Sequence, residues 1–295
     1  MRRIKLTIAY DGTNYHGWQK QTEGDDTIEG KLEAAIRSLL PNETPELIGA
    51  SRTDAGVHAR GNVAVFDTLS TIPAPNFTPA LNRYLPEDIR IIDSEEVPEA
   101  FHPRFQPHTK IYEYRIDNNR VPDPLKRLYC YNFSFPLDLY AMQRAAEYLI
   151  GVHDFRSFVN PDSQVFQRGG DAVREIYHID ICRISPEEGA FEPNASAGQM
   201  VNAAGDGQKP DTGCATSPEL SGGELRIRIS GNGFLYHMIR IIAGTLLEVG
   251  TGKRKPEDIP DILSQRDRRA AGRTAPAKGL TLVKLVYQDT PLPHV

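Results

Sequence analysis

A two-residue alternation of apolar and polar side chains recurs along this chain and constrains its fold more than any other feature. Residues 3–10, 112–116 and 225–229 each place apolar or aromatic side chains at every second position. Because successive side chains of a strand point to opposite faces of a sheet, this period predicts strands with one buried and one polar face. Such strands are typical of antiparallel sheets, whose second face often meets water.

Stretches with helical spacing separate these strands. Apolar residues recur three and four positions apart in residues 28–40, and Thr27 stands before them as an N-cap. Asp138 precedes a second stretch of this kind, which continues to Ile150. A third helix is predicted over residues 234–249, after a Gly-Asn-Gly turn.

The order of these elements divides the chain into two halves. Residues 1–117 have the predicted order β-α-β-β-α-β-β, and residues 138–295 have the order α-β-β-α-α-β. Residues 118–137, which include Pro122 and Pro124, form a predicted connector. Because helices and strands do not strictly alternate, we expect an α+β protein in which two α/β halves share a largely antiparallel sheet.

The net charge of −5 conceals an uneven distribution of charged residues. Residues 185–222 hold six acids, one base, six glycines and four prolines, and they show no periodicity. This composition predicts a flexible surface insertion. When its one base and six acids are subtracted from the totals of 34 and 39, 33 of each remain. The rest of the chain therefore has enough bases to form a basic face for a nucleic acid.

Composition also limits the class of protein. With 39% hydrophobic and 25% charged residues, the chain is typical of a soluble globular protein. It contains no apolar run of the roughly 20 residues that span a membrane, and its N-terminus predicts no signal peptide. Cys130, Cys182 and Cys214 are widely spaced, which predicts neither a zinc site nor a disulfide framework. We expect a cytoplasmic protein.

The densest set of functional side chains lies in residues 49–67, GASRTDAGVHARGNVAVFD, whose last residues predict a strand. In the loop before that strand, Asp54 follows Arg52 and is flanked by Gly49 and Gly56. This arrangement places a carboxylate on a rigid base where a ligand can reach it. A loop aspartate often only caps its own turn, but that role accounts neither for Arg52 nor for Gly56.

The segment SRTDAGVHA closely resembles the catalytic loop of the A-type tRNA pseudouridine synthases, which usually have Gly where this chain has Ser51. Six further blocks resemble the same family, occur in the family's order and span almost the whole chain. They are YDGTNYHGWQ at 10–19, FHPRF at 101–105, KIYEYR at 110–115, GVHDF at 151–155, GFLYHMIR at 233–240 and APAKGL at 275–280. The family usually has a short connection in place of residues 185–222.

The resemblance implies the pseudouridine synthase fold, with an RNA-binding active-site cleft between the halves. It also implies conversion of uridine to pseudouridine at positions 38–40 of the tRNA anticodon stem-loop, by a homodimer that holds one tRNA across both subunits. This isomerisation involves no redox change and needs neither a cofactor nor a metal. In agreement, the chain has no GxGxxG, GxxxxGK[ST] or HExxH motif.

The same resemblance assigns three catalytic residues. Asp54 is the carboxylate that adds to the ring, attacks the sugar carbon or helps to form a glycal, and the sequence leaves these routes open. Arg240 is its ion-pair partner, which keeps the carboxylate ionised and aimed. Tyr112 stacks on the detached uracil, and its hydroxyl accepts or relays a proton. Outside the KIYEYR context, Tyr112 would be better interpreted as a core tyrosine.

Other aromatic and basic residues are candidates for RNA contacts. They are Arg52, His58, Arg60, Phe101, His102, Arg104 and Arg226, with Arg228 on the same strand face as Arg226. A base in a helical stem has to be flipped out at a cost of a few kcal/mol before an enzyme can reach it. Arg52 is the candidate to hold the backbone of that nucleotide or to fill the space it leaves. The residues of FHPRF suit loop packing almost equally well.

Two other functions fit parts of the sequence. A non-catalytic RNA-binding protein on the same fold has no need for Asp54, Tyr112 and Arg240 together. A glycoside or nucleoside hydrolase usually needs two cooperating carboxylates. Beside the acids in SRTDAGVHA, YDGTNYHGWQ and KIYEYR, the only acid in the family-like blocks is Asp154 in GVHDF. We assign no role to Asp154. The leading hypothesis is therefore a tRNA-modifying isomerase.

Overall fold

The computed structural model describes residues 1–20, 26–160, 170–184 and 222–288, so the predicted insertion lies, except for Gly222, outside the described residues. Its strands are β1 (Arg2–Tyr10), β2 (Ile48–Gly49), β3 (His58–Thr68), β4 (Ile89–Val97), β5 (His108–Asp117), β6 (Tyr131–Asn132), β7 (Gly151–Asp154), β8 (Val173–Ile184), β9 (Glu224–Gly231) and β10 (Leu280–Tyr287). Together they form one sheet of ten strands. The alternation in the sequence therefore predicted the main element of the fold correctly.

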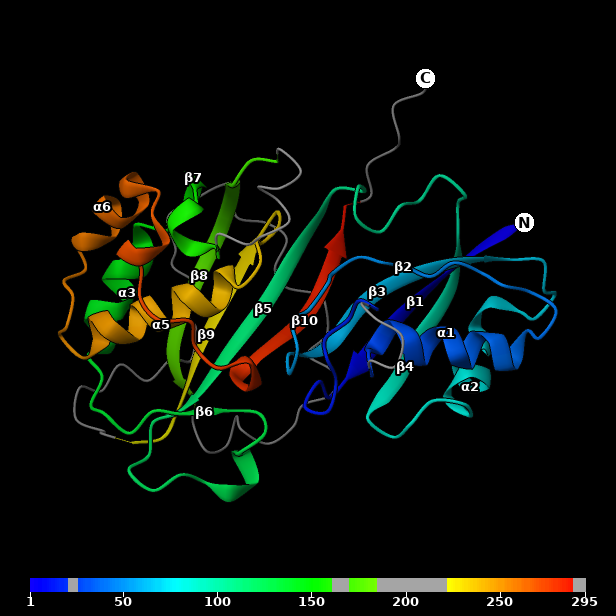
Figure 1. The fold of residues 1–295 in the computed structure, drawn as a ribbon, viewed down its shortest axis with the longest axis horizontal. Coiled ribbons are helices and arrows are strands. Elements are labelled where there is room, and N and C mark those ends of the chain that lie inside the picture. The colour runs from blue at the N-terminus through cyan, green and yellow to red at the C-terminus, as the bar shows by residue number, and fades with distance from the viewer. Residues whose placement is uncertain (21–25, 161–169, 185–221, 289–295) are drawn as a thin grey trace, which may run out of the picture.

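The α-helices lie toward the two ends of the sheet (Figure 1). They are α1 (Ile28–Leu39), α2 (Phe77–Asn82), α3 (Leu139–Glu147), α5 (Met238–Gly250) and α6 (Asp258–Gln265). In Figure 1, α1 and α2 accompany β1 and β4, whereas α3, α5 and α6 accompany β7, β8 and β9. None of the described helices has both the length and the apolar character that crossing a membrane requires.

The sheet is mostly antiparallel. Its strand order is β4-β1-β3-β10-β5-β9-β8-β7, while β2 pairs with β3 and β6 with β5. Only two pairs among the described strands are parallel, β10 with β3 and β5 with β6. This topology confirms the predicted α+β class. The last of the described strands, β10, lies between β3 and β5, so residues 280–287 complete the middle of the sheet.

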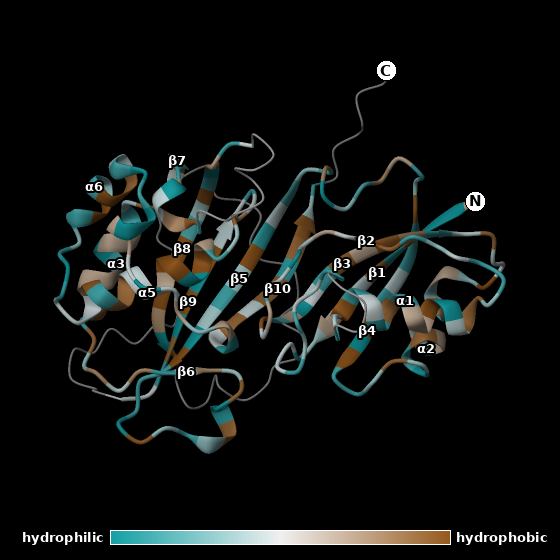
Figure 2. Cartoon of the chain, viewed as in Figure 1, coloured by the Kyte–Doolittle hydropathy of each residue, from teal (hydrophilic) through white to brown (hydrophobic). Residues whose placement is uncertain are grey.

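The core forms where the alternating strands meet the helices. In β1 the side chains of Ile4, Leu6 and Ile8 are fully buried. In α5 every residue is buried except Arg240 and Glu248, which are partly buried. Figure 2 shows the corresponding hydrophobic colour on α5, β8 and β9. Because a helix that is apolar on nearly all sides belongs in the interior, α5 is a rigid support for the few polar groups it carries.

The first residues of the helices can be compared with those predicted from the sequence. The Thr27 side chain accepts a hydrogen bond from Gly30 N, and the Asp138 side chain accepts one from Ala141 N, so both predicted N-caps are confirmed. The predicted start of α5 at residue 234 is wrong by four residues, because α5 begins at Met238. The reason is His237, whose φ of 62° is left-handed and interrupts the helix.

Candidate active site

The loop between β2 and β3, residues 50–57, carries Asp54 and is held against the loop that follows β1. Trp18 N donates a hydrogen bond to Thr53 O over 3.0 Å. Gly17 has a φ of 94°, and a Cβ atom there would lie 2.8 Å from Thr53 O. Only glycine fits this conformation and this close approach. The position of Asp54 is therefore set by main-chain contacts between two loops.

An ion pair joins this loop to α5. Arg240 Nη1 donates to Asp54 Oδ2 over 3.0 Å, and the two side chains are only 14% and 12% exposed. The guanidinium is itself anchored, because Arg240 Nε donates to Ala275 O over 2.8 Å. Ala275 N in turn donates to Arg240 O over 3.0 Å. The structure thus brings together two predicted catalytic residues and fixes the arginine at both of its ends.

The segment that holds the arginine crosses α5 at very close range. A Cβ atom on Gly244 would lie 1.8 Å from Arg273 O, a distance that atoms cannot adopt. Glycine at this position of a buried helix therefore allows residues 273–275 to reach Arg240. The sequence showed this glycine inside a helical pattern without indicating why it is there.

Tyr112 projects from β5 and is 8% exposed. Its ring packs edge-on against Phe234 with the ring centroids 5.4 Å apart. Burial raises the pKa of Tyr112 well above its ordinary value, and the charge of Asp54 raises it further. The hydroxyl therefore stays protonated near neutral pH, where it can donate a hydrogen bond.

Asp54 and Tyr112 line one pocket of about 1120 Å³, which we call the central pocket. Its walls come from residues 16–20, 50–57 and 234–239, with single residues from β5 and other segments. Asp54 is the only acid among the described residues that line it. This volume is enough for a flipped nucleotide, since ligand pockets usually measure about 300 to 1000 Å³.

Two cations lie beside the start of the loop that carries Asp54. Arg104 Nε donates to Gly49 O over 2.7 Å, and Lys110 Nζ donates to Ala50 O over 3.1 Å. Burial lowers the pKa of Lys110 to about 8, and the neighbouring cations Arg104 and Arg174 add to this effect. Both cations donate to carbonyl oxygens, which carry no net charge, and Glu29 acts on Arg104 more weakly than the neighbouring cation Arg52 does. An anionic ligand would therefore be attracted here.

The sequence did not indicate Lys110, although a signal was present. Lys110 and Tyr112 are two residues apart on β5, and side chains at this spacing project from the same face of a strand. His237 was also missed. Its Nε2 lies 3.5 Å from Asp54 Oδ2. Helical spacing gave no signal, because His237 has a left-handed backbone and lies before α5; the available signal was its place with Arg240 in the GFLYHMIR block.

His58, a predicted RNA contact, has a structural position. It is 4% exposed. Its Nδ1 lies 3.1 Å from both Gly12 N and Asp11 Oδ1, and its Nε2 lies 3.1 Å from Leu128 O and 3.2 Å from Lys278 O. Both ring nitrogens thus have partners inside the protein, and the imidazole joins three distant segments of the chain.

Arg60 and Arg226 do not join Asp54. The strand register places Arg226 opposite Arg115, and Arg228 opposite Glu113. These positions of β5 alternate with Tyr112, so they belong to the opposite face of the sheet. Arg226 Nη2 donates to Asp180 Oδ2 over 3.5 Å. The pKa of Arg60 is lowered by burial and by the nearby charge of Arg115, which places Arg60 on that same face.

The FHPRF segment separates into packed and presented side chains. Phe101 packs against Tyr287, with the ring centroids 5.0 Å apart. His102 and Phe105 stack on each other at 4.2 Å, and Phe105 is 80% exposed. An exposed ring in a stacked pair is suited to a further stacked base. Arg52, also exposed, lines the central pocket with Arg104.

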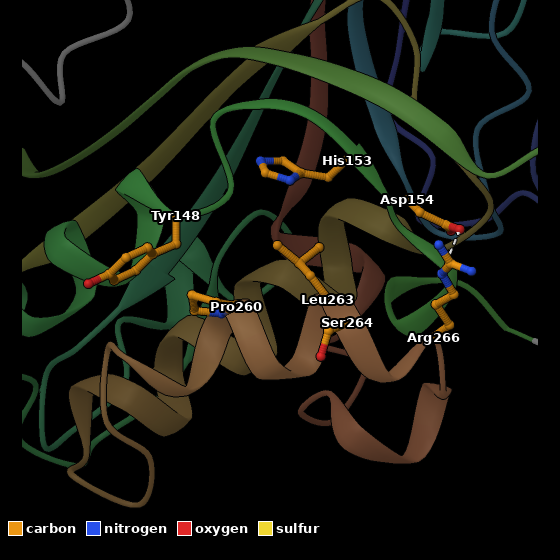
Figure 3. Close-up of a pocket in the computed structure, with 7 residues that line it drawn as sticks. All are labelled: Tyr148, His153, Asp154, Pro260, Leu263, Ser264 and Arg266. Carbon is orange, nitrogen blue, oxygen red and sulfur yellow. Dashed lines mark ion pairs between the residues drawn. The ribbon is translucent and has the colours of Figure 1, made fainter.

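Asp154, the second acid considered in the sequence, lies in a different pocket of about 480 Å³, which we call the peripheral pocket (Figure 3). Its Oδ2 is 3.2 Å from Arg266 Nε and 3.4 Å from Arg156 Nε. Figure 3 shows the side chains of Asp154 and Arg266 pointing toward each other beside Leu263 and Ser264. Asp154 is not among the residues that line the pocket of Asp54, so the two acids do not form a hydrolase pair.

Known proteins similar to this chain define its class. The profile of the family described as tRNA pseudouridine synthase matches residues 6–106 and 145–288. The matched part includes Asp54 and Arg240, whereas Tyr112 falls between the two matched ranges. The chain belongs to the tRNA pseudouridine synthase family, and it is accordingly an enzyme of the isomerase class.

Individual relatives agree over nearly the full length. The chain is 41% identical over 287 residues to tRNA pseudouridine synthase A of Brevibacillus brevis, covering 97% of this chain and 100% of the relative. It is 43% identical over 290 residues to tRNA pseudouridine synthase A 2 of Clostridium tetani, covering 97% and 99%. It is 42% identical over 287 residues to tRNA pseudouridine synthase A of Acetivibrio thermocellus, covering 97% and 100%. The family expected from the sequence is confirmed.

Proposed function

We propose that this enzyme converts uridine to pseudouridine at positions 38–40 of the tRNA anticodon stem-loop, with Asp54 as the catalytic carboxylate. The observation that carries the proposal is the buried ion pair of Asp54 with Arg240, on the wall of a pocket of about 1120 Å³. A carboxylate fixed in this way beside a nucleotide-sized pocket serves a reaction, because binding alone does not need it.

The reaction breaks the N1–C1′ bond of uridine and forms a C5–C1′ bond, and the proton that leaves C5 is replaced in the product by one on N1. Asp54 supplies the negative charge that this exchange requires, either as a nucleophile or as a base. Arg240 holds the carboxylate by a charged hydrogen bond and limits its rotation. Tyr112, protonated and buried, packs beside the uracil and donates to it while the base turns.

The substrate is held by charge and stacking. Arg52, Arg104 and Lys110 present cations beside the catalytic loop, and phosphate contacts of this kind supply most of the affinity of RNA-binding proteins. The stacked pair of His102 and Phe105 offers a platform for an unpaired base. Flipping the target uridine costs a few kcal/mol, and these contacts offset that cost.

The proposal includes a cytoplasmic homodimer that holds the anticodon arm of one tRNA across two subunits. Its support is the resemblance of the sequence blocks to the family. Light scattering of the purified protein, alone and with tRNA, tests this part. A monomer that binds one tRNA would contradict the homodimer without affecting the assignment of Asp54.

The test of the function is incubation of the purified protein with unmodified tRNA transcripts that carry uridine at position 38, 39 or 40, followed by mapping of pseudouridine. We expect conversion at these positions by the wild type and none by Asp54→Asn. Tight tRNA binding without conversion by the wild type would favour a non-catalytic RNA-binding protein. Conversion only at other positions would contradict the assigned target.

A further inference from the structure

His237 has an unusual backbone and an unusual side-chain environment. It is one of two non-glycine residues with positive φ in the described part of the chain, at 62°. It is also the N-cap of α5, yet its side chain makes no capping hydrogen bond. L residues rarely adopt this conformation, and those that do cluster at functional sites, where a side chain has to be aimed.

The ring of His237 bridges two polar groups of the pocket. Its Nδ1 lies 2.8 Å from Asn160 Nδ2, and its Nε2 lies 3.5 Å from Asp54 Oδ2. The ring also stacks on Tyr236, with the centroids 3.7 Å apart. Asn160, His237 and Asp54 all line the central pocket, so the bridge is part of the catalytic cavity.

The contact with Asn160 selects one form of the imidazole. The amide nitrogen of Asn160 donates, so Nδ1 of His237 accepts and carries no proton. A neutral ring then carries its proton on Nε2, the atom that faces Asp54. Burial lowers the pKa of His237, the cations Arg240 and Arg268 lower it further, and Asp54 opposes them. A neutral donor holds the carboxylate without adding a second full positive charge beside it.

Both contacts to the Asp54 carboxylate fall on one oxygen. Arg240 Nη1 and His237 Nε2 approach Oδ2 at 3.0 and 3.5 Å. No hydrogen bond or ion pair among the described residues reaches Oδ1. The distance to His237 is long for a hydrogen bond, as catalytic contacts often are in free enzymes before they tighten with substrate. Two donors on one oxygen restrict the rotation of the carboxylate more than one donor does.

We propose that His237, oriented by Asn160, is a positioning residue. Its Nε2–H donates a hydrogen bond to Oδ2 of Asp54 and leaves Oδ1 as the oxygen that reacts. The inference rests on the proposed function of Asp54. It predicts that His237 affects the chemical step more than tRNA binding. It also predicts that Asn160 acts on the rate only through the imidazole.

The first test compares two substitutions at His237. His237→Gly removes the imidazole and relieves the left-handed backbone, so the melting temperature should stay the same or rise. Its single-turnover rate should fall by about 10- to 100-fold, the effect of losing one hydrogen bond to a charged group, with tRNA affinity within about twofold. His237→Gln, which restores an N–H at the same reach, should recover most of this loss. An unchanged rate in His237→Gly, or a rate that falls only together with stability, would overturn the proposal.

The second test changes the tautomer. In Asn160→Asp the new carboxylate accepts from Nδ1–H, so the neutral ring turns its unprotonated Nε2 toward Asp54. The charged groups around the ring are then Asp54, the new Asp at 160, Arg240 and Arg268, beside the Tyr236 hydroxyl. The new acid raises the pKa of His237, so the rate should fall as pH rises through neutrality while Asn160→Ala shows no such step. Equal pH profiles for both variants would contradict the proposal.

A third measurement separates this inference from the function. Nitrogen NMR shifts of labelled histidine report the tautomer of His237 without any substrate, with His237→Gln to assign the signal. We expect a neutral ring protonated at Nε2. A ring protonated at Nδ1 would overturn the inference even if the enzyme is active. A wild type that forms no pseudouridine in tRNA would instead overturn the proposed function, and the tautomer would still stand as measured.

Discussion

The two pockets described above each contain an aspartate that is paired with arginine, and they differ in how the arginine is held. Arg240, opposite Asp54, is 14% exposed, lies on a buried helix and is fixed by Ala275 O. Arg266, opposite Asp154, is 60% exposed and has a φ of 52° at the end of α6. An ion pair aims a carboxylate only where both partners are immobile, so the same two residue types form a candidate site in one pocket and a surface contact in the other.

The largest effect should come from removing the charge of each aspartate. Asp54→Asn should lower the single-turnover rate by about 10⁴-fold or more, because the reaction requires a carboxylate. The fold and the tRNA affinity should be retained, since the change is isosteric and an amide oxygen at this position can still accept a hydrogen bond from Arg240. Asp154→Asn is the matched control and should keep the rate within about twofold. A wild-type rate in Asp54→Asn, measured by pseudouridine mapping over time, would remove Asp54 as the catalyst.

Truncating the arginine of each pair should show how much its support matters. Arg240→Met leaves the buried Asp54 carboxylate without its cation, so the free energy of unfolding should fall by about 2 to 3 kcal/mol. Arg266→Met should change it by less than about 1 kcal/mol, because exposed ion pairs contribute little. Urea unfolding of both variants measures the difference. Equal losses would show that the two pairs are held alike.

The pH dependence of tRNA binding should reveal the contribution of Lys110, which lies beside the loop that carries Asp54. Lys110 has a pKa of about 8 in the free protein. Its charge is therefore lost as pH rises from 7 to 9, and affinity should fall by up to about tenfold over this range. Lys110→Gln should bind tRNA more weakly than the wild type at pH 7 and should not show this fall in affinity with rising pH. A step that persists in Lys110→Gln would assign it to another group.

The smallest effect is expected in the salt dependence of binding. If Arg104 contacts a phosphate, Arg104→Gln should lower the slope of log affinity against log salt by about 0.7 to 0.9. Arg266→Gln, in the peripheral pocket, should leave the slope unchanged. Filter binding over a range of potassium concentrations measures both. A reduced slope in Arg266→Gln would extend the RNA-binding surface to the peripheral pocket.

The sequence predicted the features that depend on short spacings. Alternation in residues 3–10 predicted β1, and the N-caps at Thr27 and Asp138 were placed correctly. The blocks of residues around Asp54 and Arg240 identified the family, and their resemblance also predicted the ion pair that the structure contains. These features can be predicted from the sequence because neighbouring residues set local backbone geometry, and because a reacting loop retains its residue types.

Only the tertiary structure decided which side chains share the pocket. Alternation shows that Arg226 and Arg228 lie on one face of a strand, but not that this face is opposite Tyr112 in the assembled sheet. Asn160 and His237 are 77 residues apart, and Arg240 and Asp54 are 186 apart. Whether such residues meet depends on strand register, on the passage of residues 273–275 over Gly244, and on the left-handed backbone of His237. These are properties of packing between distant segments, which local spacing in the sequence does not encode.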